Sequence, residues 1–132
     1  MLKLEIVTPE RKVVDETVDT VTIPTLSGEA GILPQHAPLV SGLKPGIVSY
    51  TNKGNIEKLA IGGGFAEVNS DKISILTNQA ESASEIDVDE ARAQREDAEK
   101  ALASSSNSPV EDTEELRDRL DYANARLQLT GR

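Results

Sequence analysis

The chain has 132 residues, a formal net charge of −9, no cysteine and only three aromatic residues, Tyr50, Phe65 and Tyr122. The lack of cysteine excludes a disulfide framework, a thiolate metal site and a cysteine nucleophile. The acidic balance and the few aromatics argue against a nucleic-acid partner, and no apolar run approaches 18 residues, which argues against direct membrane insertion.

Residues 1–84 have the pattern of a small β-sandwich. Short, alternating, β-branched runs are separated by Gly, Pro and Asn about every ten residues. We expect about ten short strands, with clear runs at 3–7, 13–17, 21–24, 31–33, 40–43, 46–51, 56–61, 65–69 and 72–76. Alternation places six side chains in the core: Leu2, Leu4, Ile6, Val68, Ile73 and Ile75.

Two glycine-rich segments of this part carry no recognisable chemistry. Residues 27–46 crowd Gly, Pro and the single histidine, His36, into an apolar stretch, which suggests a surface shaped for a protein partner. One histidine alone makes neither a catalytic triad nor a zinc site, so we expect no catalytic residue and no metal. Gly62-Gly63-Gly64 precedes a strand and no Lys-Ser or Lys-Thr, which predicts a bulge or close strand crossing rather than a phosphate loop.

Residues 85–132 have helical spacing. Asp87 followed by Glu90 is a plausible capping box for a first helix, and Ser108-Pro109 is a strong start for a second. A stripe recurs along the second helix at Leu116, Leu120, Ala123 and Leu127. The predicted fold is therefore mixed β and α, with a ten-stranded N-terminal β-sandwich domain (1–84) and a C-terminal antiparallel two-helix hairpin domain (85–132).

The hairpin is highly charged and poor in large apolar side chains. It holds 7 basic and 13 acidic residues, against 7 and 10 in residues 1–84. Burial of each large apolar side chain contributes about 1.5–3 kcal/mol, whereas ordering the backbone costs about 1–2 kcal/mol per residue before helix hydrogen bonds are counted. We therefore expect a hairpin that folds against a support and exchanges one support for another at low cost.

Three stretches together resemble one family. SGEAGILPQHAPLVSGLKPG at 27–46, AIGGGFAEV at 60–68 and IDVDEARAQREDAEKALASS at 86–105 are similar to the epsilon subunit of bacterial and chloroplast F-type ATP synthases. The resemblance implies a noncatalytic rotor subunit of the central stalk of a proton-translocating enzyme. Its sandwich would bind the gamma subunit and the c-ring, and its hairpin would extend toward the alpha and beta subunits and restrain ATP hydrolysis.

The resemblance also implies a location and a set of contact residues. The expected location is peripheral, on the cytoplasmic face of a bacterial plasma membrane in preference to the stromal face of a thylakoid. The implied c-ring contacts are Glu29, Ile32 and His36, and the implied gamma contacts are Pro38, Gly62, Gly63 and Phe65.

Three arginines of the second helix are the implied regulatory residues: Arg117, Arg119 and Arg126. Arg119 and Arg126 share a helix face and could meet acidic groups on beta. The alternative is pairing within the helix, since Glu115 and Arg119 are four residues apart, which contributes about 0.2–0.5 kcal/mol.

Some bacterial members of the family bind ATP through an Ile/Leu-Asp-x-x-Arg-Ala motif and further arginines. The candidate residues here are Asp87, Arg92 and Arg126. The ungapped alignment, however, puts Glu90 and Asp97 at two arginine positions and Tyr122 at a third. Carboxylates repel a triphosphate, so we expect no tightly bound ATP and no cofactor.

Two other classes stay open on the residues alone. A free-standing β-sandwich adaptor or chaperone-like module, whose hairpin clamps a client, would form self-sufficient oligomers and have no affinity for a gamma subunit. An enzyme would need a catalytic constellation, for which the chain has one histidine, no cysteine and no carboxylate pair assignable to one pocket.

Overall fold

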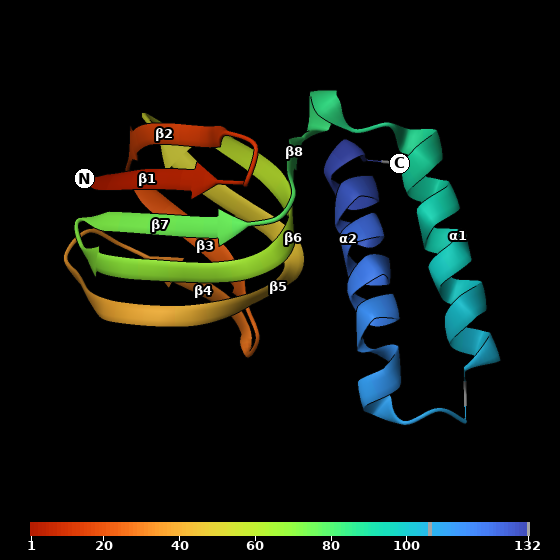
Figure 1. Ribbon diagram of the computed structural model, residues 1–132. Coiled ribbons are helices and arrows are strands. Elements are labelled where there is room, and N and C mark those ends of the chain that lie inside the picture. The colour runs from red at the N-terminus through yellow and green to blue at the C-terminus, as the bar shows by residue number, and fades with distance from the viewer. Residues whose placement is uncertain (106, 132) are drawn as a thin grey trace.

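The computed structural model describes residues 1–105 and 107–131, apart from the side chains of residues 36 and 111. Figure 1 shows a layered β structure with a pair of helices beside it. The strands are β1 (Leu2–Val7), β2 (Lys12–Val18), β3 (Thr20–Thr25), β4 (Gly28–Ile32), β5 (His36–Asn52), β6 (Asn55–Ser70), β7 (Lys72–Thr77) and β8 (Ala80–Ser82). The helices are α1 (Val88–Ser104) and α2 (Glu114–Thr130), preceded by single 3₁₀ turns at Ala83–Glu85 and Val110–Thr113.

The fold class is confirmed, but the predicted number of strands is wrong. The described residues form eight strands instead of ten, because the runs 40–43 and 46–51 belong to one long strand, β5, and the runs 56–61 and 65–69 belong to β6. The intervening Pro45 and Gly62 stay in register as a pair, so the glycines bend the strand and do not end it. The short β8, with the sequence AES, has no strand pattern and was not expected.

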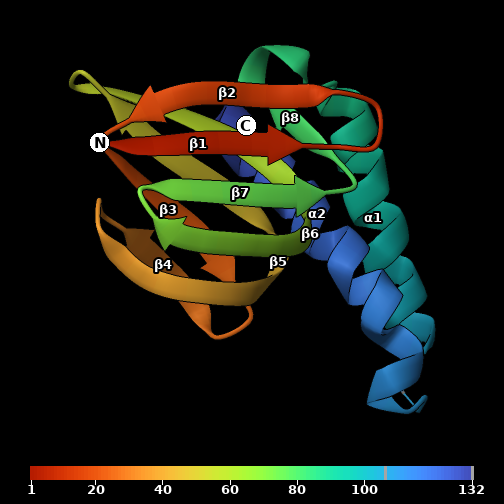
Figure 2. The same cartoon turned by 60° about the vertical axis from the view of Figure 1, so that its left-hand side comes forward.

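The strands form one hydrogen-bonded sheet that folds over itself in the order β2-β1-β7-β6-β5-β3-β4, with β8 paired to β6. Figure 2 shows β2, β1, β7 and β6 side by side in the near layer. The halves of β5 and β6 beyond the bend continue into the other layer, where β5 pairs with β3 and β6 with β8.

Gly64 explains why glycine is required at the bend. Its φ is +135°, and a Cβ placed there would lie 1.9 Å from the carbonyl oxygen of Leu76 on the neighbouring strand. No side chain fits such a distance, so the strands approach this closely only with glycine. The expectation of a close strand approach at residues 62–64 is confirmed at this position.

Between the layers lies the main core, which includes all six side chains expected from alternation. This core is made entirely of residues from β1–β7. A second, smaller cluster joins the hairpin to the sandwich and contains Ala60, Ile86, Ala91, Tyr122, Ala125 and Leu127. Because no hairpin residue that the structure describes enters the main core, the sandwich has what it needs to fold without the helices.

The hairpin packs against the sandwich through α2, which contacts β5 and β6 and lies between them and α1 (Figure 1). Asp87 caps α1, accepting a 3.1 Å hydrogen bond from the backbone N–H of Glu90, and Gly131 ends α2 in the left-handed region with φ +73°. Asp87 is therefore the N-cap of the predicted capping box, while the Glu90 side chain lies near Arg126, and the stop at Gly131 agrees with the sequence prediction.

The start of the second helix differs from the prediction at Ser108-Pro109. A 3₁₀ turn occupies Val110–Thr113, and α2 begins at Glu114. The hydroxyl of Thr113 donates to the carbonyl of Val110 over 3.0 Å, which fits a tight first turn of the 3₁₀ kind.

Candidate partner-binding surfaces

An exposed row of apolar side chains crosses the outer face of the sandwich. Val7 lies opposite Leu76, and Leu76 lies opposite Phe65, so the three point to the same side of the sheet. Phe65 lies opposite Gly42, over which the side chain of Leu26 folds. We call Val7, Leu76, Phe65 and Leu26 the apolar row.

These side chains are exposed to an extent that is unusual for a sheet. Phe65 is 63% exposed, Leu76 57% and Leu26 72%, and Val40 is exposed on the same face two residues along β5 from Gly42. The chain has only three aromatic residues and leaves one of them in solvent here. A contiguous exposed apolar surface of this kind is typical of a protein-binding site.

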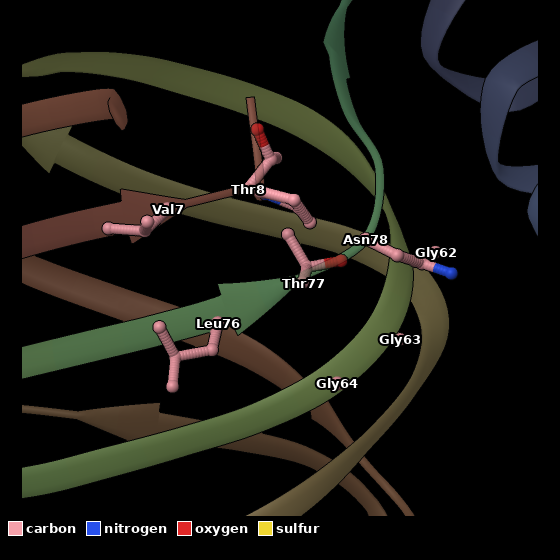
Figure 3. Close-up of a pocket in the computed structure, with 9 residues that line it drawn as sticks. Val7, Thr8, Gly62, Gly63, Gly64, Leu76, Thr77 and Asn78 are labelled. Carbon is pink, nitrogen blue, oxygen red and sulfur yellow. The ribbon is translucent and has the colours of Figure 1, made fainter. Parts of the chain in front are cut away.

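A groove of about 550 Å³ continues the apolar row toward the bend of β6. Its walls include Val7, Pro9 and Leu76, and the backbone of Gly62–Gly64 forms one side (Figure 3). The groove is mostly apolar, with Thr8, Thr77 and Asn78 as its polar groups. It is suited to an apolar side chain from a partner that covers the row.

The residues expected to contact gamma are only partly gathered here. Phe65 is in the apolar row, and Gly62 and Gly63 line the groove. Gly63 itself is buried, so it contributes backbone shape. Pro38 is exposed near the start of β5, away from the bend at Pro45 and Gly62.

The residues expected to contact the c-ring lie on and beside β4. Glu29 is exposed and lines a groove with Lys44 and the α2 residue Asp121. Ile32 is 1% exposed and belongs to the sandwich core, so its side chain is not available at the surface. We therefore do not include Ile32 among the residues proposed to contact the c-ring. His36 pairs with Ser70 through its backbone; its side chain lies outside the described residues.

A polar cluster around a buried arginine joins the hairpin to the sandwich. Arg126 on α2 is only 4% exposed, and its Nε lies 2.9 Å from Oε1 of Glu81 on β8. On its other side, Nη1 lies 3.4 Å from Oε1 of Glu90 and donates to Oε1 of Gln94 over 3.2 Å, both on α1. The Tyr122 hydroxyl donates a 2.6 Å hydrogen bond to Glu81, and the Arg126 guanidinium lies 5.6 Å from the Tyr122 ring centroid. We call these five residues the polar cluster.

Burial governs the chemistry of Tyr122. Desolvation, followed by its hydrogen bond to the Glu81 carboxylate, raises the pKa of Tyr122 well above 10.0. The hydroxyl therefore stays a donor at any physiological pH. The cluster thus holds one cation between two carboxylates at the junction of β8, α1 and α2.

The other arginines expected to be regulatory have local partners. Arg119 is exposed and pairs with Glu115 at 3.3 Å, the intrahelical alternative raised from the spacing. Arg117 donates to the hydroxyl of Thr113. Neither contact involves the sandwich.

The three candidate nucleotide residues have different surroundings. Asp87 caps α1, and Arg92 is exposed on the same helix. Arg126 has its ion pairs with Glu81 and Glu90.

Several residues of these surfaces were missed by the sequence analysis. Leu76 had a signal, because it stands out of phase with Ile73 and Ile75 and must therefore point outward. Glu81 and Gln94 had no such signal in the sequence, because they lie 45 and 32 residues away from Arg126 and nothing local relates them to it.

Within residues 1–105 and 107–131, no group of three or more His, Cys, Asp or Glu side chains is arranged to hold a metal ion. In the same part of the chain, no helix is long and apolar enough to cross a membrane.

Comparison with known families gives two adjacent matches. Residues 1–83 match the model described as "ATP synthase, Delta/Epsilon chain, beta-sandwich domain", and residues 84–131 match "ATP synthase, Delta/Epsilon chain, long alpha-helix domain".

Relatives match over most of their length. The ATP synthase epsilon chain of Syntrophobacter fumaroxidans is 45% identical, covering 97% of this chain and 87% of the relative. That of Gloeobacter violaceus is 42% identical, covering 98% and 97%. That of Carboxydothermus hydrogenoformans is 51% identical over a shorter stretch, 77% and 76%.

Solved structures agree. A chain in the mitochondrial ATP synthase of Euglena gracilis, solved as OSCP/F1/c-ring, superposes with a TM-score of 0.78 at 28% identity and covers 99% of this chain and 81% of that one. A chain of the Tetrahymena thermophila central stalk and c-ring assembly, at 14% identity and a TM-score of 0.64, shares the fold. These matches favour a noncatalytic subunit of the rotary ATP synthase over the two other classes, a free-standing adaptor and a chain that is itself an enzyme. The chain therefore belongs to the ATP synthase epsilon-chain family, whose members are noncatalytic subunits of the complex.

Proposed function

We propose that the chain couples the gamma subunit to the c-ring in the central stalk of a proton-translocating F-type ATP synthase and restrains ATP hydrolysis through its hairpin. The observation that carries this proposal is the apolar row, an exposed surface on a fold whose relatives are stalk subunits. We assign the row and its groove to gamma, because a large desolvated apolar contact suits a permanent partner that transmits torque.

The c-ring contact is proposed for Glu29 and His36, near the β3–β4 turn and the start of β5. The complex would hold the subunit on the cytoplasmic face of a bacterial plasma membrane, without any insertion of this chain. The hairpin is docked on the sandwich in this structure. The proposed restraint on hydrolysis requires a second, extended conformation in which the hairpin reaches the alpha and beta subunits.

We also propose that this regulation does not use bound ATP. The arginine that would meet a phosphate, Arg126, is already neutralised by Glu81 and Glu90. A triphosphate would have to displace two carboxylates in a chain with a net charge of −9. Equilibrium dialysis of the purified chain with ATP tests this, and saturable binding at micromolar ATP would refute it.

ATPase activity of the stalk-and-head complex lacking this subunit tests the main proposal. The full chain and a truncation ending at Ala83, which keeps the whole main core, are added back separately. We expect both to bind and only the full chain to lower hydrolysis. If both bind and neither inhibits, the hairpin has no braking role; if neither binds, the proposed coupling is wrong.

A further inference from the structure

A row of carboxylates runs beside the apolar row on the same face of the sheet. Asp15 on β2 lies opposite Glu5 on β1, which lies opposite Ser74 on β7. Ser74 lies in turn opposite Glu67 on β6. Each of the last three residues stands two positions along its strand from a member of the apolar row, so both rows point to the same side. We call Asp15, Glu5 and Glu67 the carboxylate row.

Two members of the carboxylate row have cations within the chain. Oε1 of Glu5 lies among three ammonium groups, at 3.9 Å from Lys3, 3.9 Å from Lys12 and 3.6 Å from Lys72. Asp15 lies 3.8 Å from Lys3 and 3.5 Å from Lys12. The side chain of Glu5 is only 16% exposed beneath these lysines. Both carboxylates at this end of the row are therefore neutralised before any partner binds.

Glu67, at the other end of the carboxylate row, differs from both. It is exposed, and no residue in the part of the chain that the structure describes forms an ion pair or a side-chain hydrogen bond with its carboxylate. Its neighbours on this face include two exposed apolar side chains, Phe65 two positions along β6 and Val40 directly opposite on β5. The structure thus places one unpaired charge at the margin of the apolar row.

A partner that covers the apolar row also takes water away from Glu67. Removing a carboxylate from water without a cation costs free energy, whereas a charge-assisted hydrogen bond to a lysine or arginine compensates for that loss. The three lysines of the same face contact Glu5 and Asp15 instead. The compensating cation must therefore come from the partner.

We propose that Glu67 is the specificity-determining charge of this surface and binds a lysine or arginine side chain of the partner that covers the apolar row. The partner's surface is then apolar, with one cation about 7 Å to the side, the spacing of two residues along a strand. This inference rests on the proposed function, in which that partner is the gamma subunit. The alternative is that Glu67 acts only in the isolated chain, where a charge beside exposed apolar side chains keeps two copies from associating.

Binding of full-length variants to the stalk-and-head complex lacking this subunit tests the inference. Glu67→Gln keeps the shape of the side chain and should weaken binding by about tenfold, because the charge is lost. Glu67→Lys should weaken it by about a hundredfold or more, because two cations then meet. Added salt should lower the affinity of the wild type more steeply than that of Glu67→Gln, since salt screens the pair that only the wild type forms.

Glu57→Gln is the matched control. It removes the same charge from an exposed position on the same strand, beyond the bend of β6 and away from the apolar row, and should bind as the wild type does. Equal losses in Glu57→Gln and Glu67→Gln would show an effect of net charge alone and would overturn the inference. Sedimentation of each isolated variant checks the alternative. A loss of affinity confined to concentrations at which Glu67→Gln self-associates would overturn the inference in favour of that alternative.

Phe65→Ser in the same assay separates this inference from the proposed function. If Phe65→Ser weakens binding and both Glu67 variants bind as the wild type does, the partner supplies no cation; the inference fails, while the assignment of the apolar row to gamma stands. If the wild type does not bind, or if Phe65→Ser and both Glu67 variants bind equally well, the assignment to gamma fails and takes the inference with it.

Discussion

The Tyr122 hydroxyl reaches the Glu81 carboxylate at 2.6 Å, joining two residues 41 positions apart in the chain. Glu81 lies on the last strand of the sandwich, and Tyr122 is a buried residue in the middle of α2. The bond orients the carboxylate that Arg126 contacts one turn further along the helix. Hairpin docking therefore depends on a specific polar contact in addition to apolar burial.

Tyr122→Phe should weaken docking without disturbing the sandwich. The ring still fills its place, but the hydrogen bond to a charged group is lost, at a cost of about 1.5–3 kcal/mol. Limited proteolysis within the hairpin should become faster than in the wild type. Tyr50→Phe is the matched control, because Tyr50 donates a similar 3.0 Å bond to Glu16 inside the sandwich. Equal hairpin cleavage in both variants would contradict the assignment.

Both tyrosines should lose their phenolic protons only at strongly alkaline pH. Burial first, then the hydrogen bond to Glu16, raises the pKa of Tyr50 to about 12, and the pKa of Tyr122 is raised above 10.0 by its own burial. A raised pKa means that the docked state holds the phenolic proton more tightly. Its contribution to docking is thus complete below about pH 10 and is lost as the pH rises through the docked pKa.

Absorbance of tyrosinate measures this titration directly, because the chain has two tyrosines and no tryptophan. Tyr50→Phe isolates the signal of Tyr122. Adding Glu81→Gln to that variant should lower the apparent pKa toward 10, since the hairpin is released. An unchanged titration after loss of Glu81 would argue that Tyr122 is not at the docking interface.

Gly64→Ala should destabilise the sandwich more than Gly28→Ala does. Both glycines have a positive φ, +135° and +124°, so both substitutions carry backbone strain of about 1–3 kcal/mol. Only at Gly64 does the new Cβ meet the backbone of β7, which adds about 1–3 kcal/mol of overpacking. Urea unfolding of the two variants gives the difference, and equal losses would remove the close approach as the reason for this glycine.

Phe65→Ser should weaken binding to the gamma subunit by about tenfold or more, because an aromatic anchor is lost from a desolvated contact. The stability of the isolated chain should change little, since Phe65 is 63% exposed. Ile56→Ser is the control, with 64% exposure at the far turn between β5 and β6. Titration of each variant against gamma-containing complex compares the affinities; equal loss in both would contradict the role of the apolar row.

Amide exchange should be uneven along the wild-type chain. The strands around the main core should exchange most slowly, because seventeen buried side chains from β1–β7 hold them. The hairpin rests on a smaller cluster and should open at lower free energy. Residues 88–129 exchanging as slowly as the strands would refute a hairpin that is docked conditionally.

The sequence alone determined the two-part architecture, because local patterns carry that information. Alternation placed Leu2, Leu4, Ile6 and Ile75 in the core, and Asp87 and Gly131 mark helix ends through interactions within one turn. The prediction ended one strand at residue 61 and began another at residue 65, whereas β6 is continuous and only bends there. A run of glycines in the sequence looks the same whether the strand bends or ends.

Only the tertiary structure decided which side chains meet. Val7, Leu76, Phe65 and Leu26 form one row because three strand registers and a turn align them, and none of these registers is written in a single segment. Arg126 had a helical position in the sequence, but its partners lie on β8 and α1. Whether it is free or buried therefore depends on how α2 packs, since charge pairing is set by distance in space and not along the chain.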